Sequence, residues 1–116
     1  MAEPIPQFKA HIVFTFEEHD VSRRHWFGFD NQVHRAVPMS MESVDGLNTV
    51  ILRIEGAGKF YKGDAIDADC NVIWEEGYRK AVVPGRKFKL WDGGFFANGE
   101  VTQRVEEGWA NPKKSN

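Results

Sequence analysis

Apolar and polar residues alternate strictly over residues 8–17. Successive side chains of a β-strand point to opposite faces, so a period of two with one apolar face is typical of a half-buried strand. Residues 66–74 show the same pattern more clearly, with aspartate and asparagine between the apolar positions. The two apolar faces are Phe8, Ala10, Ile12, Phe14 and Phe16 in the first segment, and Ile66, Ala68, Cys70, Val72 and Trp74 in the second.

Three further segments predict strands. Residues 33–41 are the weakest candidate: Pro38 has no backbone N–H for a sheet ladder, which predicts an edge or a bulge there. Residues 48–55 (NTVILRIE) are apolar and β-branched, as strands often are. Residues 87–105 alternate as far as Gly93-Gly94, a pair that supplies the positive φ of a tight hairpin turn, and resume beyond it.

About six short strands, with glycines at the turns and little convincing helix, predict an all-β fold. We expect a six-stranded antiparallel β-barrel, because closing the sheet removes edges that a Phe-rich chain would leave exposed. Its 116 residues suit one domain, and a hydrophobic content of 41% with nine Phe and four Trp can fill its core. We expect an extended lead-in at residues 1–7, the barrel at 8–110 and a flexible tail at 111–116.

The net charge and the cysteine content limit the expected partners and the expected cellular compartment. A net charge of −2 does not indicate a dedicated nucleic-acid binder, although it leaves room for a local basic patch. The single cysteine, Cys70, excludes an internal disulfide framework and is predicted to be a buried, inert thiol. No leader-like segment and no apolar run of roughly 18 residues is present, so we expect a cytoplasmic protein without a membrane span.

Several motifs suggest chemistry at first sight. Residues 56–60 (GAGKF) contain the Gly-Lys of a phosphate-binding loop, but Phe60 stands where Ser or Thr would reach magnesium, so no nucleotide is expected. The four histidines lack the spacing of a metal site. Asp67 and Asp69 share the polar face of their strand, where a solvated exterior is a better interpretation than acid–base catalysis. We therefore expect no enzymatic activity, no metal and no cofactor.

The strongest candidate for binding is the loop at residues 22–27 (SRRHWF). Arg23, Arg24, His25 and Trp26 bring two guanidinium groups, an imidazole and an indole together. Arginine forks suit phosphates, and aromatic side chains stack on bases or anchor protein interfaces. The alternative is that Trp26 and Phe27 plug the end of the barrel while the arginines pair with nearby acidic residues.

Three segments resemble one protein family. Residues 87–101 follow the pattern K-F-x-L-x-x-G-G-x-x-x-x-G-x-V, residues 63–66 follow G-D-x-I, and residues 8–14 (FKAHIVF) match a first strand. Together they resemble the C-terminal β-barrel domain of bacterial elongation factor Tu. The resemblance implies a six-stranded antiparallel Greek-key barrel, here without the GTPase domain. It also implies that Arg24 and His25, which match the family's Gly-Arg-His turn, contact tRNA.

The chain departs from the family around that turn. Arg23 replaces the family's glycine, residues 29–35 replace a Gly-Tyr-Arg-Pro stretch, and Phe95 stands where the family has an arginine after the glycine pair. Core and turn residues match better than functional ones, which favours a barrel retained for its architecture. We therefore expect a non-catalytic binding module with a protein partner, for which Trp91 or Trp109 is a further candidate anchor.

Two alternatives remain. The first is a tRNA- or RNA-binding module that uses Arg23, Arg24, His25 and Trp26. The second is a small enzyme with an unrecognised site, which a deep cavity holding His11 or Asp67 would support.

Overall fold

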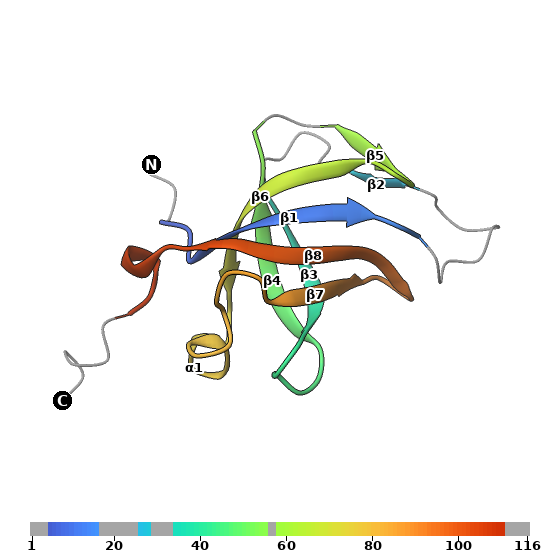
Figure 1. Ribbon diagram of the computed structural model, residues 1–116. Coiled ribbons are helices and arrows are strands. Elements are labelled where there is room, and N and C mark those ends of the chain that lie inside the picture. The colour runs from blue at the N-terminus through green and yellow to red at the C-terminus, as the bar shows by residue number, and fades with distance from the viewer. Residues whose placement is uncertain (1–4, 17–25, 29–33, 56–57, 111–116) are drawn as a thin grey trace.

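A computed structural model describes residues 5–16, 26–28, 34–55 and 58–110. Six strands close into a barrel in which every neighbouring pair is antiparallel (Figure 1). The predicted all-β fold and six-stranded antiparallel barrel are confirmed. The barrel strands are β1 (Phe8–Phe14), β3 (His34–Met41), β4 (Asn48–Arg53), β6 (Ala65–Val72), β7 (Lys87–Trp91) and β8 (Phe95–Arg104).

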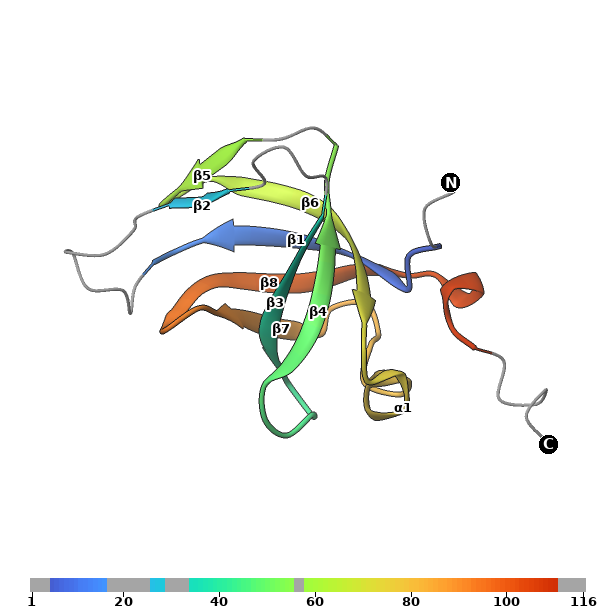
Figure 2. The ribbon, with the colours of Figure 1, turned by 180° about the vertical axis from the view of Figure 1, so that it is seen from behind.

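The order of strands around the barrel is β1-β6-β4-β3-β7-β8. Strands β3, β4 and β6 are neighbours in sequence order, whereas β1 lies between β6 and β8 (Figure 2). The long connections needed for this order are compatible with a Greek key, and the Greek-key connectivity itself stays a prediction.

The alternating faces pack as predicted over most of their length. In β1 and β6, every predicted apolar position inside the strand is buried. Trp74 is the exception, because β6 ends at Val72 and Trp74 precedes a one-turn helix, α1 (Glu75–Tyr78), within the predicted loop. Half of its surface is exposed, so the prediction that Trp74 shares the inner face is wrong.

Pro38 lies inside β3, which is a central strand of the barrel. On one side, β3 pairs with β4 through Pro38 and Thr49; on the other, its pairing with β7 covers only Met39 to Met41. Pro38 therefore lies one residue before the β7 ladder begins. The predicted edge is wrong for the strand as a whole, but the proline does sit where one of the two ladders stops.

A two-stranded ribbon lies outside the barrel ladder and was not predicted. It consists of β2 (Trp26–Gly28) and β5 (Lys59–Tyr61), paired antiparallel. In Figure 1 the ribbon lies at one end of the barrel, and the start of β1 lies at the opposite end. Lys59 opens strand β5, whereas the lysine of a phosphate-binding loop would lead into a helix.

The two ends of the described chain are joined at Gln7, which is buried. Its backbone N–H donates a hydrogen bond of 2.9 Å to the carbonyl oxygen of Cys70. Its side-chain oxygen accepts a hydrogen bond of 2.6 Å from the backbone N–H of Val72. Its carbonyl oxygen accepts from the backbone N–H of Val105 and from the indole N–H of Trp109, both at 3.0 Å. Trp109 follows a short 3₁₀ helix (Glu106–Gly108) and is only 7% exposed, so the prediction of an exposed anchor there is wrong.

Candidate functional site

Three residues of the predicted binding loop, Arg23, Arg24 and His25, lie outside the described residues. The fourth, Trp26, is the first residue of β2. The described part of the candidate site therefore begins with the β2–β5 ribbon, into which the predicted loop runs directly in sequence.

The inner side of this ribbon is fixed to the barrel by aromatic stacking. Phe27 and Phe60 lie opposite each other in the ribbon. The Phe14 ring centroid lies 5.8 Å from that of Phe27 and 5.5 Å from that of Phe60, with the rings close to parallel. Phe27 also stacks on Phe96 at 4.9 Å and is fully buried. Phe27 thus fills the end of the barrel, as one of the sequence interpretations expected, whereas Trp26, which that interpretation also placed there, lies on the outer side of the ribbon.

The outer side of the ribbon carries Trp26, Lys59 and Tyr61, which we call the ribbon face. Trp26 lies opposite Tyr61, and Gly28 lies opposite Lys59. Tyr61 is 51% exposed, whereas Trp26 is half-buried. The ammonium of Lys59 lies 4.4 Å from the centroid of the Trp26 ring, at the distance of a cation–π contact. The ribbon face therefore combines two large aromatic rings with a positive charge.

Two side chains, Asp64 and Arg35, hold the ribbon in place from the sides. The backbone N–H of Tyr61 donates to the carboxylate of Asp64 at 2.7 Å, in the turn that leads to β6. Arg35 of β3 donates to the carbonyl oxygen of Gly28, and its guanidinium carbon lies 4.4 Å from the centroid of the Phe27 ring. The ribbon is therefore bonded to the barrel as well as packed against it.

Other candidate residues from the sequence occupy ordinary structural positions. Cys70 is fully buried, and burial raises the pKa of its thiol, with Asp69 adding to the rise and Arg53 opposing it. The Nδ1 of His11 donates a hydrogen bond of 2.9 Å to the carboxylate of Asp67 on the outer surface of β1 and β6, and the ammonium of Lys9 lies 3.7 Å from the carboxylate of Asp69. Within the described residues, no three histidine, cysteine or acidic side chains gather as a metal site would require.

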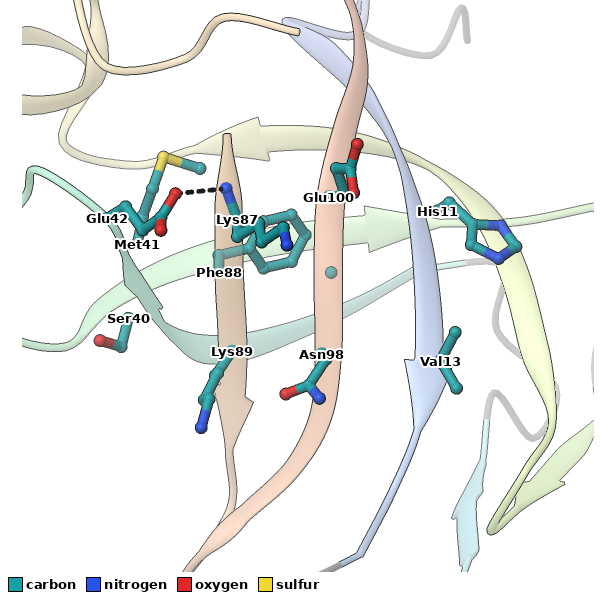
Figure 3. Close-up of a pocket in the computed structure, with 11 residues that line it drawn as sticks. His11, Val13, Ser40, Met41, Glu42, Lys87, Phe88, Lys89, Asn98 and Glu100 are labelled. Carbon is teal, nitrogen blue, oxygen red and sulfur yellow. Dashed lines mark hydrogen bonds between the residues drawn. The ribbon is translucent and has the colours of Figure 1, made fainter. Parts of the chain in front are cut away.

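A groove crosses the outer wall of the barrel over β1, β8, β7 and β3, with a volume of about 580 Å³ (Figure 3). His11 lies at one side of it, while Asp67 is not among its lining residues. The cross-strand neighbours of His11 are Asp67 and Glu100, neither of which is a nucleophile that an imidazole would activate. The groove was missed by sequence reasoning, because its lining comes from four strands that are far apart in the chain.

Among the residues that the structure describes, no helix is long and apolar enough to cross a membrane. Comparison with known proteins adds no family: no protein-family model matches the sequence, and no curated protein matches it.

Proposed function

We propose that the protein is a non-catalytic binding module that docks a protein partner on its ribbon face. The observation that carries this proposal is the ribbon itself, in which Tyr61 is half exposed beside Trp26 while Phe27 and Phe60 anchor the opposite side. Tyrosine and tryptophan dominate the energetic centres of protein interfaces. A ribbon already stacked on Phe14 loses little further conformational freedom when a partner binds.

The proposal includes a relation to the C-terminal barrel of elongation factor Tu. Its support is the glycine-containing motif of residues 87–101 together with the six-stranded barrel. Gly93 has φ +73°, as expected of the glycine pair that turns β7 into β8. The proposal also includes a reducing, cytoplasmic setting, since the only cysteine is a buried free thiol.

The protein-partner proposal is tested by quantitative affinity capture with three immobilised proteins: wild type, Tyr61→Ala and Trp74→Ala. Tyr61 and Trp74 are about equally exposed, at 51% and 50%, but lie in the ribbon and beside α1 respectively. We expect a specific partner to bind wild type and Trp74→Ala and to be lost from Tyr61→Ala. Partners retained equally by all three proteins would contradict docking on the ribbon face.

RNA binding is the second candidate, and a specific observation favours it. Lys59 supplies a cation over the Trp26 ring, and Arg23, Arg24 and His25 directly precede Trp26 in sequence. Stacking on exposed aromatic rings beside cations is how single-stranded nucleic acids are commonly held. By the resemblance to elongation factor Tu, the ligand would be tRNA.

Fluorescence anisotropy with aminoacyl-tRNA and uncharged tRNA, at low and physiological salt, tests this second candidate. Phosphate contacts release counterions, so RNA binding should weaken steeply as salt rises. Arg24→Ala/His25→Ala and Lys59→Gln should each reduce it, whereas Lys80→Gln, a substitution of an exposed lysine after α1, should not. Binding that is absent at both salt concentrations would exclude the RNA candidate and leave the protein partner.

A further inference from the structure

The groove on the barrel wall is lined by two rows of side chains that cross four neighbouring strands. Register places His11 opposite Glu100 and Glu100 opposite Lys87, and the backbone of Lys87 exchanges two 3.0 Å hydrogen bonds with Glu42. This is the charged row, in which Lys87 lies between the carboxylates of Glu100 and Glu42. The second row, two residues along each strand, consists of Val13, Asn98, Lys89 and Ser40.

The two central residues of the first row carry opposite charges. Lys87 and Glu100 lie directly opposite each other, yet among the described residues neither the ammonium nor the carboxylate makes an ion pair or a hydrogen bond. On the adjacent surface, by contrast, Lys9 pairs with Asp69 at 3.7 Å. The Asn98 amide and the Ser40 hydroxyl in the second row also have no hydrogen bond to a described residue.

The dimensions of the groove suit a small molecule. Neighbouring strands lie about 4.8 Å apart and alternate residues about 7 Å apart, so the two rows cover roughly 14 by 7 Å. The volume of about 580 Å³ falls within the roughly 300–1,000 Å³ of small-molecule sites. Val13 and the buried Phe88 add apolar surface to the lining. A molecule of dipeptide size fits within such a space.

We propose that this groove binds a small zwitterion of the dipeptide class. The ligand carboxylate would meet the Lys87 ammonium and the ligand ammonium would meet Glu100, with Asn98 beside them in the second row. Figure 3 shows these three side chains on β7 and β8. A simple anion fits less well, because Glu42 and Glu100 flank Lys87 on both sides. A simple cation also fits less well, because the two lysines of β7, Lys87 and Lys89, line the groove and would repel it. This site is separate from the ribbon face, and the proposal does not depend on the partner proposed there.

The ligand class is tested by titrating the ¹⁵N-labelled protein with glycyl-leucine while recording ¹H–¹⁵N spectra. We expect saturable shifts at the Asn98 side-chain amide and at the backbone amides of residues 87–89 and 98–100. Two derivatives each remove one ligand charge: N-acetyl-glycyl-leucine lacks the ammonium and glycyl-leucinamide lacks the carboxylate. Weaker binding of both derivatives supports a zwitterion site, whereas equal binding of either one overturns it.

The protein side is tested with Lys87→Gln and Glu100→Gln. An exposed ion pair is worth up to about 1 kcal/mol, so each substitution should weaken glycyl-leucine binding about two- to fivefold. Lys80→Gln and Glu76→Gln are the matched controls, because both residues are exposed near α1 and do not line the groove. An unchanged affinity in Lys87→Gln and Glu100→Gln, or no saturable shift in wild type, would overturn the proposal.

Discussion

Gly99 shows how one residue can determine the packing of two strands. It lies opposite Phe88 in the β7–β8 ladder, and both residues are buried. A Cβ atom at Gly99 would lie 2.2 Å from the Phe88 ring, well inside van der Waals contact. The ring is 3% exposed and packs edge-on against Phe8 at 6.3 Å, so it has little room to move. The ring therefore occupies the space that the missing side chain leaves.

Gly99→Ala is expected to lower the free energy of unfolding by about 1–3 kcal/mol, the usual cost of overpacking a core. Urea denaturation measures the change. Because the clash is with Phe88, the additional substitution Phe88→Leu should recover part of the loss, giving a favourable coupling in a double-mutant cycle. Strictly additive effects would show that Gly99→Ala acts through the backbone instead.

Cys70 predicts a pH dependence of stability. Burial raises the pKa of this thiol far above its ordinary value of 9.0, so it stays protonated in the folded protein while the unfolded chain ionises. The stability that the protonated thiol contributes is fully present below the pKa of the unfolded chain. It is lost as the pH rises from that value toward the higher pKa of the folded protein. The free energy of unfolding should therefore fall by up to about 1.4 kcal/mol per pH unit above about pH 9.

Urea denaturation between pH 8 and pH 10 checks this slope. The upper limit keeps small the contribution of Tyr78, whose pKa burial also raises above its ordinary 10.0. Cys70→Ala should show little decline over the same interval, whatever its effect on absolute stability. An equal slope in both proteins would assign the pH dependence to other groups.

At the scale of elements, the length of a strand decided whether the sequence predicted it. The seven residues of β1 and the eight of β6 are long enough for alternation to be visible, and both were predicted with their inner faces. Strands β2 and β5 have three residues each, too few to show a period. They form because Phe27 and Phe60 stack on Phe14, a contact between distant segments.

Phe60→Ala tests this account of the ribbon. Removing the ring loses its stack on Phe14, and an aromatic pair of this kind contributes about 0.5–1.5 kcal/mol beyond the area that it buries. Hydrogen exchange should therefore become faster at the amides of residues 26–28 and 59–61, with β1 and β6 still protected. Tyr61→Ala on the ribbon face is the control and should leave the pattern close to wild type. Faster exchange throughout the barrel in Phe60→Ala would mean that the ribbon is part of the global folding unit.

At the scale of the whole molecule, the end of the chain completes the barrel. Trp109 lies beyond the last strand, yet it is buried, with its indole bonded to Gln7 and the Arg104 guanidinium carbon 4.5 Å from its ring centroid. Nothing local in the sequence distinguishes it from the half-exposed Trp74, because its burial depends on a residue 102 positions away. The groove was unpredictable for the same reason, since register across four strands assembles it.

Trp109→Ala is expected to lower the free energy of unfolding by about 3–5 kcal/mol, as for other buried tryptophans. Trp74→Ala should cost less, because half of that side chain is already in water. Thermal and urea denaturation of the two variants provide the comparison. A loss in Trp109→Ala no larger than a small loss in Trp74→Ala would indicate that the segment after β8 contributes little to the folded barrel.

The contact of Gln7 with Val105 and Trp109 also sets how the protein responds to mechanical tension. β1 begins where β8 ends, with Phe8 opposite Arg104 in an antiparallel pair. A force that pulls the two ends apart acts across this ladder, so its hydrogen bonds carry the load one after another instead of together. The bonds from Val105 and Trp109 to Gln7 precede this ladder and would break before it. A protein tethered by both ends should therefore yield at low force, with β1 and β8 separating from the Gln7 end, even if its equilibrium stability is high.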